Sequence, residues 1–300
     1  MDTKKKNIWI VNHYAIPPNL GGLSRHYYFS KFLSKTEKYN VSIFSSSKIH
    51  NTDINKITDG SFYKQETIMD VPYTFIKTSD YNSNGFSRIK NMLEFPFRVQ
   101  RLPKHFEKPD VIYTSSPTPF TAFSAIILAK RLKVPVIVEV RDLWPESVVA
   151  YNGMSKKNPI IMVLYALEKW IYKKATKLVF TMEGGKDYIK EKNWEKKIDL
   201  TKVENVNNGV DLEQFLKDKD EFDYKDIDLD NDDIFKITYA GSIRKVNNLG
   251  AVLEIAKEIK SRGLNKVRFL IFGDGNEKDE LIQKCKDENI DNVVFKGKVS

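Results

Sequence analysis

The sequence predicts an α/β protein built from two doubly wound parallel-sheet domains, the second of them incomplete. A chain of 300 residues has room for about two domains of ~150 residues, and its 41% hydrophobic content is enough to fill their cores. Short apolar and β-branched runs alternate with stretches of helical periodicity along nearly the whole chain. This alternation is typical of parallel sheets covered by helices.

The first 210 residues contain the elements of a complete domain. Their apolar runs lack the alternation of a half-exposed strand, so they predict strands that are buried on both faces. Strands are expected at 8–11, 41–45, 111–113, 136–140 and 178–180, and helices at 24–33, 121–132, 159–174 and 185–192.

Residues 235–300 contain only part of a second domain. The pattern predicts strands at 235–240, 267–272 and 293–296, with helices at 249–262 and 277–288. So few elements cannot cover both faces of a parallel sheet. We expect a fragment or truncated reading frame whose continuation completes the domain; the alternative is a small domain that docks on the first region.

Charge is distributed unevenly over these regions. Lys and Arg number 33 against 20 Asp and Glu in residues 1–210, 3 against 11 in residues 211–234, and 13 against 9 in residues 235–300. The acidic stretch predicts a linker, and its aspartates lack the Gly and Glu spacing of a calcium loop. No nucleic-acid-binding motif accompanies the net charge of +9. We therefore expect no nucleic acid as a partner, although the chain is basic.

The chain lacks the features of membrane-spanning, secreted and common hydrolytic proteins. Its apolar runs are shorter than the ~20 residues of a bilayer span, and the run after the lysines at 4–6 is too short for a signal peptide. A single cysteine, Cys285, excludes an internal disulfide and fits a reducing cytoplasm. Gly-x-Ser-x-Gly, His-Glu-x-x-His and Walker motifs are absent.

Ligands of open parallel sheets bind at the carboxyl ends of the strands, so the loops there hold the candidate site residues. The loop after strand 8–11 begins with Asn12 and His13 and ends in Gly21 and Gly22, before a helix whose first turn contains Arg25. Adjacent glycines let the backbone approach a phosphate at the helix N-terminus. The alternative is a plain turn held by prolines and glycines.

The loop after strand 136–140 carries Arg141, Asp142 and Trp144. Asp142 could serve as a general base or orient a substrate hydroxyl. The alternative is an ion pair between Arg141 and Asp142 that braces the loop.

Two glycine loops follow strands of the second region. Gly241 precedes Arg244 and Lys245 near a helix start, and this suits a diphosphate because Arg can bind it through two N–H groups. Gly273 and Asp274 end the next strand, but the missing third glycine excludes the dinucleotide-binding motif.

Residues 86–108 combine six basic residues with Met92, Leu93, Phe95, Phe97 and Phe106. This composition predicts a segment that contacts an anionic membrane surface. The alternative is a surface helix pair broken by Pro96 and Pro103.

Together these motifs resemble the retaining glycosyltransferases of family 4, in particular the branch of capsule and O-antigen assembly. Those enzymes have the GT-B fold of two facing Rossmann-like domains. The resemblance rests on the following runs: Asn12-His13-Tyr14 with Pro17-Pro18 and Gly21-Gly22 before Arg25, Arg141-Asp142-Leu143-Trp144-Pro145-Glu146-Ser147, Asn208-Gly209-Val210-Asp211 with Phe215, Tyr239-Ala240-Gly241-Ser242, and Phe272-Gly273-Asp274-Gly275.

The resemblance implies transfer of a hexosyl or N-acetylhexosaminyl group from a UDP-sugar to a polyprenyl-diphosphate-linked glycan, at the inner face of the plasma membrane. It implies no metal or other cofactor, because cations and helix ends stabilise the leaving diphosphate in this fold. The implied roles are catalysis for Asp142 and His13, donor diphosphate binding for Gly21, Gly22, Arg244 and Lys245, acceptor or loop contacts for Arg25, Arg141 and Trp144, and a second-domain loop of Gly241, Gly273 and Asp274.

The sequence departs from the family pattern in two places. Arg141 stands where many relatives have a His, which weakens any role carried over to that position. The family's Glu-x7-Glu segment would lie past Ser300, so we expect little or no transferase activity from this chain. The alternatives are a non-catalytic fragment that binds partners in an assembly complex and a GT-B-type UDP-sugar epimerase.

Overall fold

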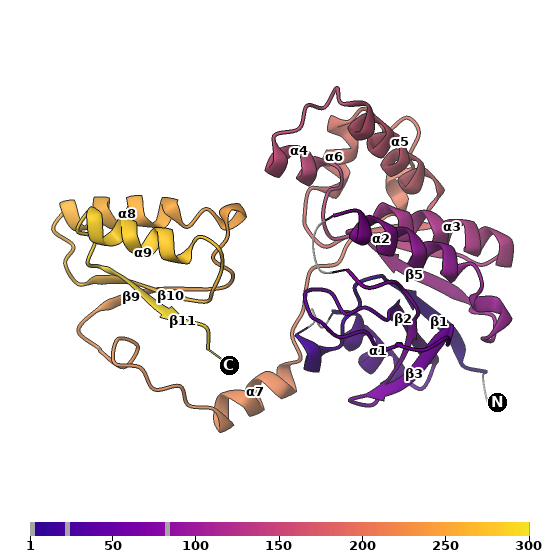
Figure 1. The fold of residues 1–300 in the computed structure, drawn as a ribbon, viewed down its shortest axis with the longest axis horizontal. Helices are drawn as coiled ribbons and strands as arrows, with labels where there is room; N and C mark the ends of the chain where they lie inside the picture. Colours follow the sequence, from indigo (N-terminus) through magenta and orange to yellow (C-terminus); the bar gives the residue numbers. More distant parts are fainter. Residues whose placement is uncertain (1–3, 22–24, 82–84, 300) are drawn as a thin grey trace. The chain divides into compact units, whose positions relative to one another are not determined.

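The computed structural model describes residues 4–21, 25–81 and 85–299, and the chain divides into two compact units. Unit 1 ends at Asp211 and unit 2 begins at Leu212 (Figure 1). Both units have helices packed on mostly parallel sheets, which confirms the predicted α/β fold class. Within the described ranges, no helix has the length and hydropathy of a bilayer span.

Unit 1 is built on a sheet that has eight strands within the described residues, in the order β3-β4-β2-β1-β5-β6-β7-β8. β3 pairs antiparallel with β4, and the other neighbouring strands run parallel. In sheet order the strands are Tyr63–Ile68, Val71–Ile76, Tyr39–Ser46, Lys6–Val11, Val111–Ser115, Val136–Val140, Lys177–Phe180 and Val203–Asn205.

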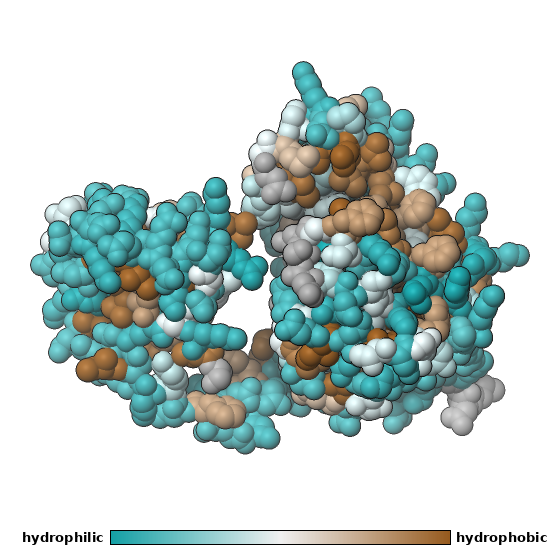
Figure 2. All heavy atoms as spheres, in the orientation of Figure 1, coloured by the Kyte–Doolittle hydropathy of each residue, from teal (hydrophilic) through white to brown (hydrophobic). Residues whose placement is uncertain are grey.

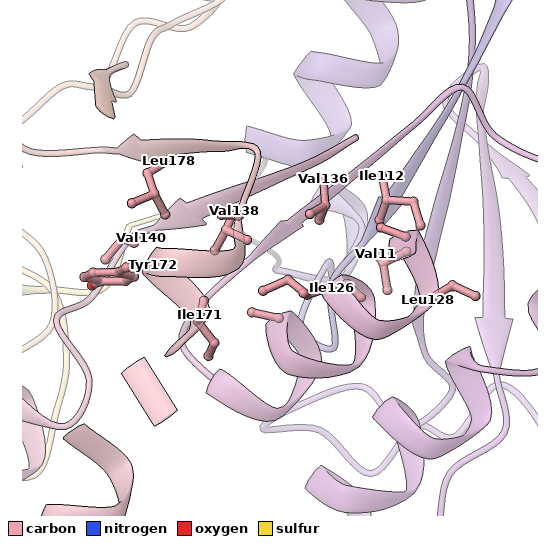
Figure 3. Close-up of a cluster of buried hydrophobic side chains, with 14 of the residues drawn as sticks. Val11, Ile112, Ile126, Leu128, Val136, Val138, Val140, Ile171, Tyr172 and Leu178 are labelled. Carbon is pink, nitrogen blue, oxygen red and sulfur yellow. The ribbon is translucent and has the colours of Figure 1, made fainter. Parts of the chain in front are cut away.

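Both faces of this sheet are buried. Along β1, Ile8 and Ile10 belong to one apolar cluster, while Trp9 and Val11 belong to another, because successive side chains of a strand point to opposite faces. Figure 3 shows part of the second cluster, in which strand residues meet Ile126, Leu128, Ile171 and Tyr172 of two covering helices.

Helices cover each face of the sheet. α1 (Arg25–Lys35) packs on the cluster that contains Ile8 and Ile10. α2 (Phe86–Val99), α3 (Pro119–Leu132) and α5 (Pro159–Lys174) cover the opposite face, where α3 contacts both α2 and α5 (Figure 1). α4 (Glu146–Asn152) and α6 (Gly185–Glu191) follow β6 and β7.

Unit 2 has a three-stranded parallel sheet within its described residues, in the order β11-β10-β9. Its elements are α7 (Leu212–Glu221), β9 (Phe235–Ala240), α8 (Gly250–Ser261), β10 (Val267–Phe272), α9 (Lys278–Asp287) and β11 (Val293–Gly297). Leu253 of α8 and Leu281 of α9 pack against Ile271 on one face of the sheet (Figure 1). α7 buries none of its side chains.

Three features differ from the expected elements. The expected sheet was wholly parallel, but the β3–β4 hairpin adds an antiparallel edge strand. Residues 86–99 form one helix that contains Pro96, and not two helices broken there; the next turn, at Leu102–Lys104, contains Pro103. Part of the expected linker forms the helix α7. Further along the linker, the carboxylates of Asp226 and Asp228 contact Lys296 of β11.

Candidate active site

A buried ion pair lies at the carboxyl end of the parallel strands in unit 1. Glu139 of β6 is fully buried, and the Nε of Arg25 donates to its Oε1 over 2.6 Å. The Tyr113 hydroxyl donates to the same oxygen over 2.5 Å. Burial and the neighbouring carboxylate raise the pKa of Tyr113, so its hydroxyl keeps the proton that it donates.

Arg25 also holds the segment that follows β8. Its Nη1 donates to the carbonyl of Asn207 and the side-chain oxygen of Asn208, and its Nη2 donates to the carbonyl of Val206. Because Arg has five N–H donors, these bonds leave little of its guanidinium free. Arg25 therefore connects α1, β6 and the segment 206–208, and its predicted contact with the acceptor stays a prediction.

His13, in the loop after β1, and His26, whose Nε2 lies 3.8 Å from Glu139 Oε2, are almost fully buried. The Nε2 of His13 lies 2.8 Å from Asn91 Oδ1, and the Nε2 of His26 lies 2.9 Å from Ser115 Oγ. Burial lowers the pKa of each histidine to about 3, so both imidazoles are neutral at pH 7. The Nδ1 of His13 is buried and has no partner among the described residues.

A cavity of about 320 Å³ opens beside Arg25. Arg141 lines it, and its guanidinium has no ion pair or hydrogen bond among the residues that the structure describes. The rest of the lining combines aromatic rings of α1 with the segment after β8: Tyr28, Phe29, Phe32, Asn208, Gly209 and Val210. The cavity thus offers a cation next to flat apolar surfaces.

The loop after β6 is fixed through its backbone. The Oγ of Ser116 accepts the N–H groups of Arg141 over 2.9 Å and of Asp142 over 3.2 Å. The Asp142 side chain is exposed, and no ion pair links it to Arg141 in the described structure, contrary to the bracing alternative. Trp144 is half-buried and lines a small void with Asp142 and Glu168.

Glu168 of α5 was not anticipated from the sequence. It is 2% exposed and accepts the hydroxyls of Tyr172 over 2.8 Å and Tyr188 over 3.0 Å. Burial raises the pKa of Glu168 to about 8. Glu139 was missed as well, although a lone carboxylate in the apolar strand Val136–Val140 is a signal that could have identified it.

The predicted glycines of the first loop are only partly described. Gly21 has φ +77° and ends the turn Pro18–Leu20, and a side chain there would meet open space. Gly22 lies outside the described residues, as does residue 24, where the first helix was expected to begin. Their predicted contact with donor phosphates stays a prediction.

In unit 2 the two glycine loops meet at the carboxyl ends of β9 and β10. A Cβ on Gly273, which has φ +141°, would lie 1.8 Å from the carbonyl oxygen of Gly241. A hollow of about 550 Å³ at this point is lined by both glycines, Asp274, Arg244 and Lys298. Lys298 was missed by the sequence analysis, and Lys245 is exposed in the adjacent turn without lining the hollow.

A family profile described as a glycosyl transferase 4-like domain matches residues 80–204. This segment includes α2, β5, β6 and α5, and therefore both Arg141 and Asp142. No curated protein is similar enough in sequence to count as a match.

Several solved structures share the fold at low sequence identity. Sucrose-phosphate synthase from Thermosynechococcus elongatus superposes with a TM-score of 0.63 and 12% identity, covering 99% of this chain and 71% of that chain. Anabaena Alr3699/HepE in complex with UDP has a TM-score of 0.61 and 10% identity, covering 98% of this chain and 70% of that chain. WaaG, a glycosyltransferase involved in lipopolysaccharide biosynthesis, has a TM-score of 0.57 and 11% identity, covering 98% of this chain and 70% of that chain. Residues 80–204 thus match a glycosyl transferase 4-like domain, within a chain that has the α/β fold of GT-B glycosyltransferases.

Proposed function

We propose that this chain is a retaining glycosyltransferase of surface-polysaccharide synthesis. It would move a hexosyl or N-acetylhexosaminyl group from a UDP-sugar to a hydroxyl of a polyprenyl-diphosphate-linked glycan. The observation that supports this most strongly is the hollow of unit 2, where Gly241 and Gly273 leave the backbone without side chains beside Arg244 and Lys298. The presence of UDP in the Anabaena structure of the same fold supports UDP as the nucleotide.

The donor diphosphate is assigned to this hollow because two cations there can neutralise the charge that develops on it. In the transfer, the bond between the sugar C1 and the diphosphate oxygen breaks, and UDP leaves with the bonding electrons. Arg244 and Lys298 would stabilise that leaving group. Lys245, Gly21 and Gly22 stay predicted donor contacts. Lys278 pairs with Asp274 at the rim and offsets its negative charge.

The acceptor is assigned to the cavity of unit 1. The rings of Tyr28 and Phe29 offer flat surfaces for sugar rings or an apolar chain, and Arg141 offers an unpaired cation for a phosphate. Trp144 lies on the neighbouring loop. Recognition of a lipid-linked diphosphate would draw on both kinds of surface.

Asp142 and His13 are the proposed catalytic residues. The new bond forms between the acceptor oxygen and C1, and the hydroxyl proton must leave. The exposed Asp142 carboxylate can orient that hydroxyl or accept its proton. His13 is neutral at pH 7, so it would act as a hydrogen-bonding group through its unpartnered Nδ1.

Calorimetric titration of the purified chain with UDP tests the donor site. We expect Arg244→Gln to weaken UDP binding about tenfold or more, because hydrogen bonds to charged groups contribute roughly 1.5–3 kcal/mol. Arg262→Gln, at the residue directly after α8, is the matched control and leaves binding unchanged. If the folded wild type binds no UDP, the donor assignment is wrong.

Transfer is tested by incubating the chain with UDP-sugars and polyprenyl-diphosphate glycans and measuring the product masses by mass spectrometry. A product heavier by one hexosyl or N-acetylhexosaminyl group would support the proposal and would contradict the expectation of little or no activity from this chain; Asp142→Asn should then lower kcat about a hundredfold or more. Asp187→Asn, which changes an exposed carboxylate of α6, is the control. Epimerised UDP-sugar in the absence of acceptor would support the epimerase alternative, and neither binding nor turnover would support a non-catalytic partner-binding role.

A further inference from the structure

α2 of unit 1 exposes a continuous apolar stripe. Phe86, Ile89, Leu93 and Phe97 are 82%, 52%, 48% and 67% exposed, although each is large and apolar. Their spacing of three or four residues places them along one side of the helix. The opposite side of α2 holds the buried Phe95 and Val99, so this helix is apolar on both its inner and its outer side.

The exposed apolar surface continues across the neighbouring helices. Ile127 of α3 and Ile160 and Val163 of α5 are 41%, 66% and 67% exposed. The rings of Phe123 and Trp170 lie 4.9 Å apart and connect α3 to α5. Figure 2 shows brown and tan spheres gathered over α5 and continuing over α2 and α3. We call this outer side of α2, α3 and α5 the helical face; so large an apolar area marks an interaction surface.

The helices that form the helical face also carry an excess of basic residues. α2, α3 and α5 contain eight Lys and Arg against two Glu. Neither glutamate offers an unpaired negative charge outwards: Glu94 pairs with Lys90 over 3.9 Å and accepts the N–H and hydroxyl of Ser79, and Glu168 is buried. Just beyond α2, the Arg101 guanidinium lies 5.5 Å from the centre of the Phe97 ring. Cations thus stand among the exposed apolar side chains.

We propose that the helical face docks on an anionic membrane surface. The apolar side chains would lie at the boundary between headgroups and acyl chains, and the cations would contact lipid phosphates. A second copy of the chain fits less well, because a two-fold contact through this face would bring two basic surfaces together. The proposal rests on the helical face alone and holds whether or not the chain transfers sugars.

Co-sedimentation with vesicles tests this docking without any sugar donor. We expect the chain to bind vesicles of equal parts phosphatidylglycerol and phosphatidylcholine and to bind pure phosphatidylcholine far less. The double variant Phe86→Ser/Phe97→Ser should bind at least tenfold less tightly, since burying each ring contributes about 1.5–3 kcal/mol. Phe215→Ser/Phe222→Ser is the matched control: it removes two exposed rings of residues 212–222, outside the helical face, and should not change binding.

A charge variant and a depth probe complete the test. Arg101→Gln should weaken binding to the anionic vesicles about fivefold, the effect of one cation near such a surface, whereas Arg262→Gln in unit 2 should not. Brominated lipids should quench the fluorescence of Trp170, and Trp170→Phe should remove that quenching. Thermal melts of all variants establish that each one is folded.

Three results would overturn the proposal. Binding that is equal for both lipid compositions would show that charge plays no part. Equal losses for the Phe86/Phe97 pair and the Phe215/Phe222 pair would show that the helical face is not the contact. A concentration-dependent dimer that Phe86→Ser/Phe97→Ser dissociates, with no vesicle binding by the wild type, would assign the face to a second copy.

Discussion

The buried pair of Arg25 and Glu139 joins parts of the chain that are 114 residues apart in sequence. Its two side chains are 6% and 0% exposed, so neither charge is solvated by bulk water. Breaking such a pair by removing one partner typically costs about 3–5 kcal/mol, because the remaining charge stays buried. We therefore propose that Arg25 holds the cavity of unit 1 in shape, whether or not it also contacts an acceptor.

Glu168 makes the stability of the fold depend on pH. Its pKa of about 8 lies above the ordinary 4.5, so between these values the folded chain holds a proton that the unfolded chain has lost. The stability that this group contributes is complete below about pH 4.5 and declines as pH rises towards 8. Relative to Glu168→Gln, which keeps an acceptor oxygen but cannot titrate, the wild type should lose up to about 1.4 kcal/mol per pH unit across this window.

Urea unfolding at a series of pH values measures this difference. Glu204→Gln is the control, because that carboxylate is exposed on β8 and pairs with Lys177 at the surface. The explanation fails if the Glu168→Gln and wild-type curves run parallel from acidic to alkaline pH.

Among the elements, the two glycine loops of unit 2 depend on backbone contact. Gly273→Ala would place a methyl group against the Gly241 carbonyl at a φ of +141°. Overpacking and the strained backbone together should lower the free energy of unfolding by about 2 kcal/mol or more and should weaken UDP binding. Gly250→Ala, where a Cβ meets nothing within 4 Å, is the control. Equal urea midpoints for the two variants would contradict the predicted close approach.

Most elements were predictable because their apolar patterns are strong. The strands Val136–Val140, Phe235–Ala240 and Val267–Phe272 and the helix Pro159–Lys174 have the bounds that the sequence indicates. β3 was missed because the strand Tyr63–Ile68 is polar and lies at the sheet edge, where only one neighbour constrains it. β4 was missed as well, although Val71–Ile76 is apolar and buried between two strands.

The candidate site was predictable only in part. Arg141, Asp142, Gly241 and Gly273 follow strands directly, so local sequence places them at the carboxyl edge. Contacts between distant segments could not be predicted, because no local pattern connects Arg25 to Glu139 or brings Lys298 to the hollow beside Arg244. Those pairings arise only when the sheet assembles.

For the whole molecule, the segment between the two sheets is its least protected part. α7 is ten residues long and buries none of them, and isolated helices of that length are marginal in water. Brief trypsin treatment should therefore cut first at Lys217 or Lys219, releasing two fragments that resist further digestion. Lys173 and Lys174 are also exposed but end the well-packed helix α5, so they serve as the internal control. Early cleavage there, identified by mass spectrometry, would contradict the assignment of two independently stable units.

The bonds of Arg25 to residues 206–208 also have a mechanical consequence. The chain leaves unit 1 through a segment that is anchored to β6, and the last residue of the unit, Asp211, is buried and accepts a hydrogen bond from Lys31 over 2.8 Å. We therefore expect the main hinge in the backbone to lie at Leu212 or beyond it. The proposed acceptor cavity, whose wall includes Asn208 and Val210, should therefore keep its shape when the backbone beyond Leu212 rotates, because Arg25 and Lys31 hold the chain on either side of that wall within unit 1.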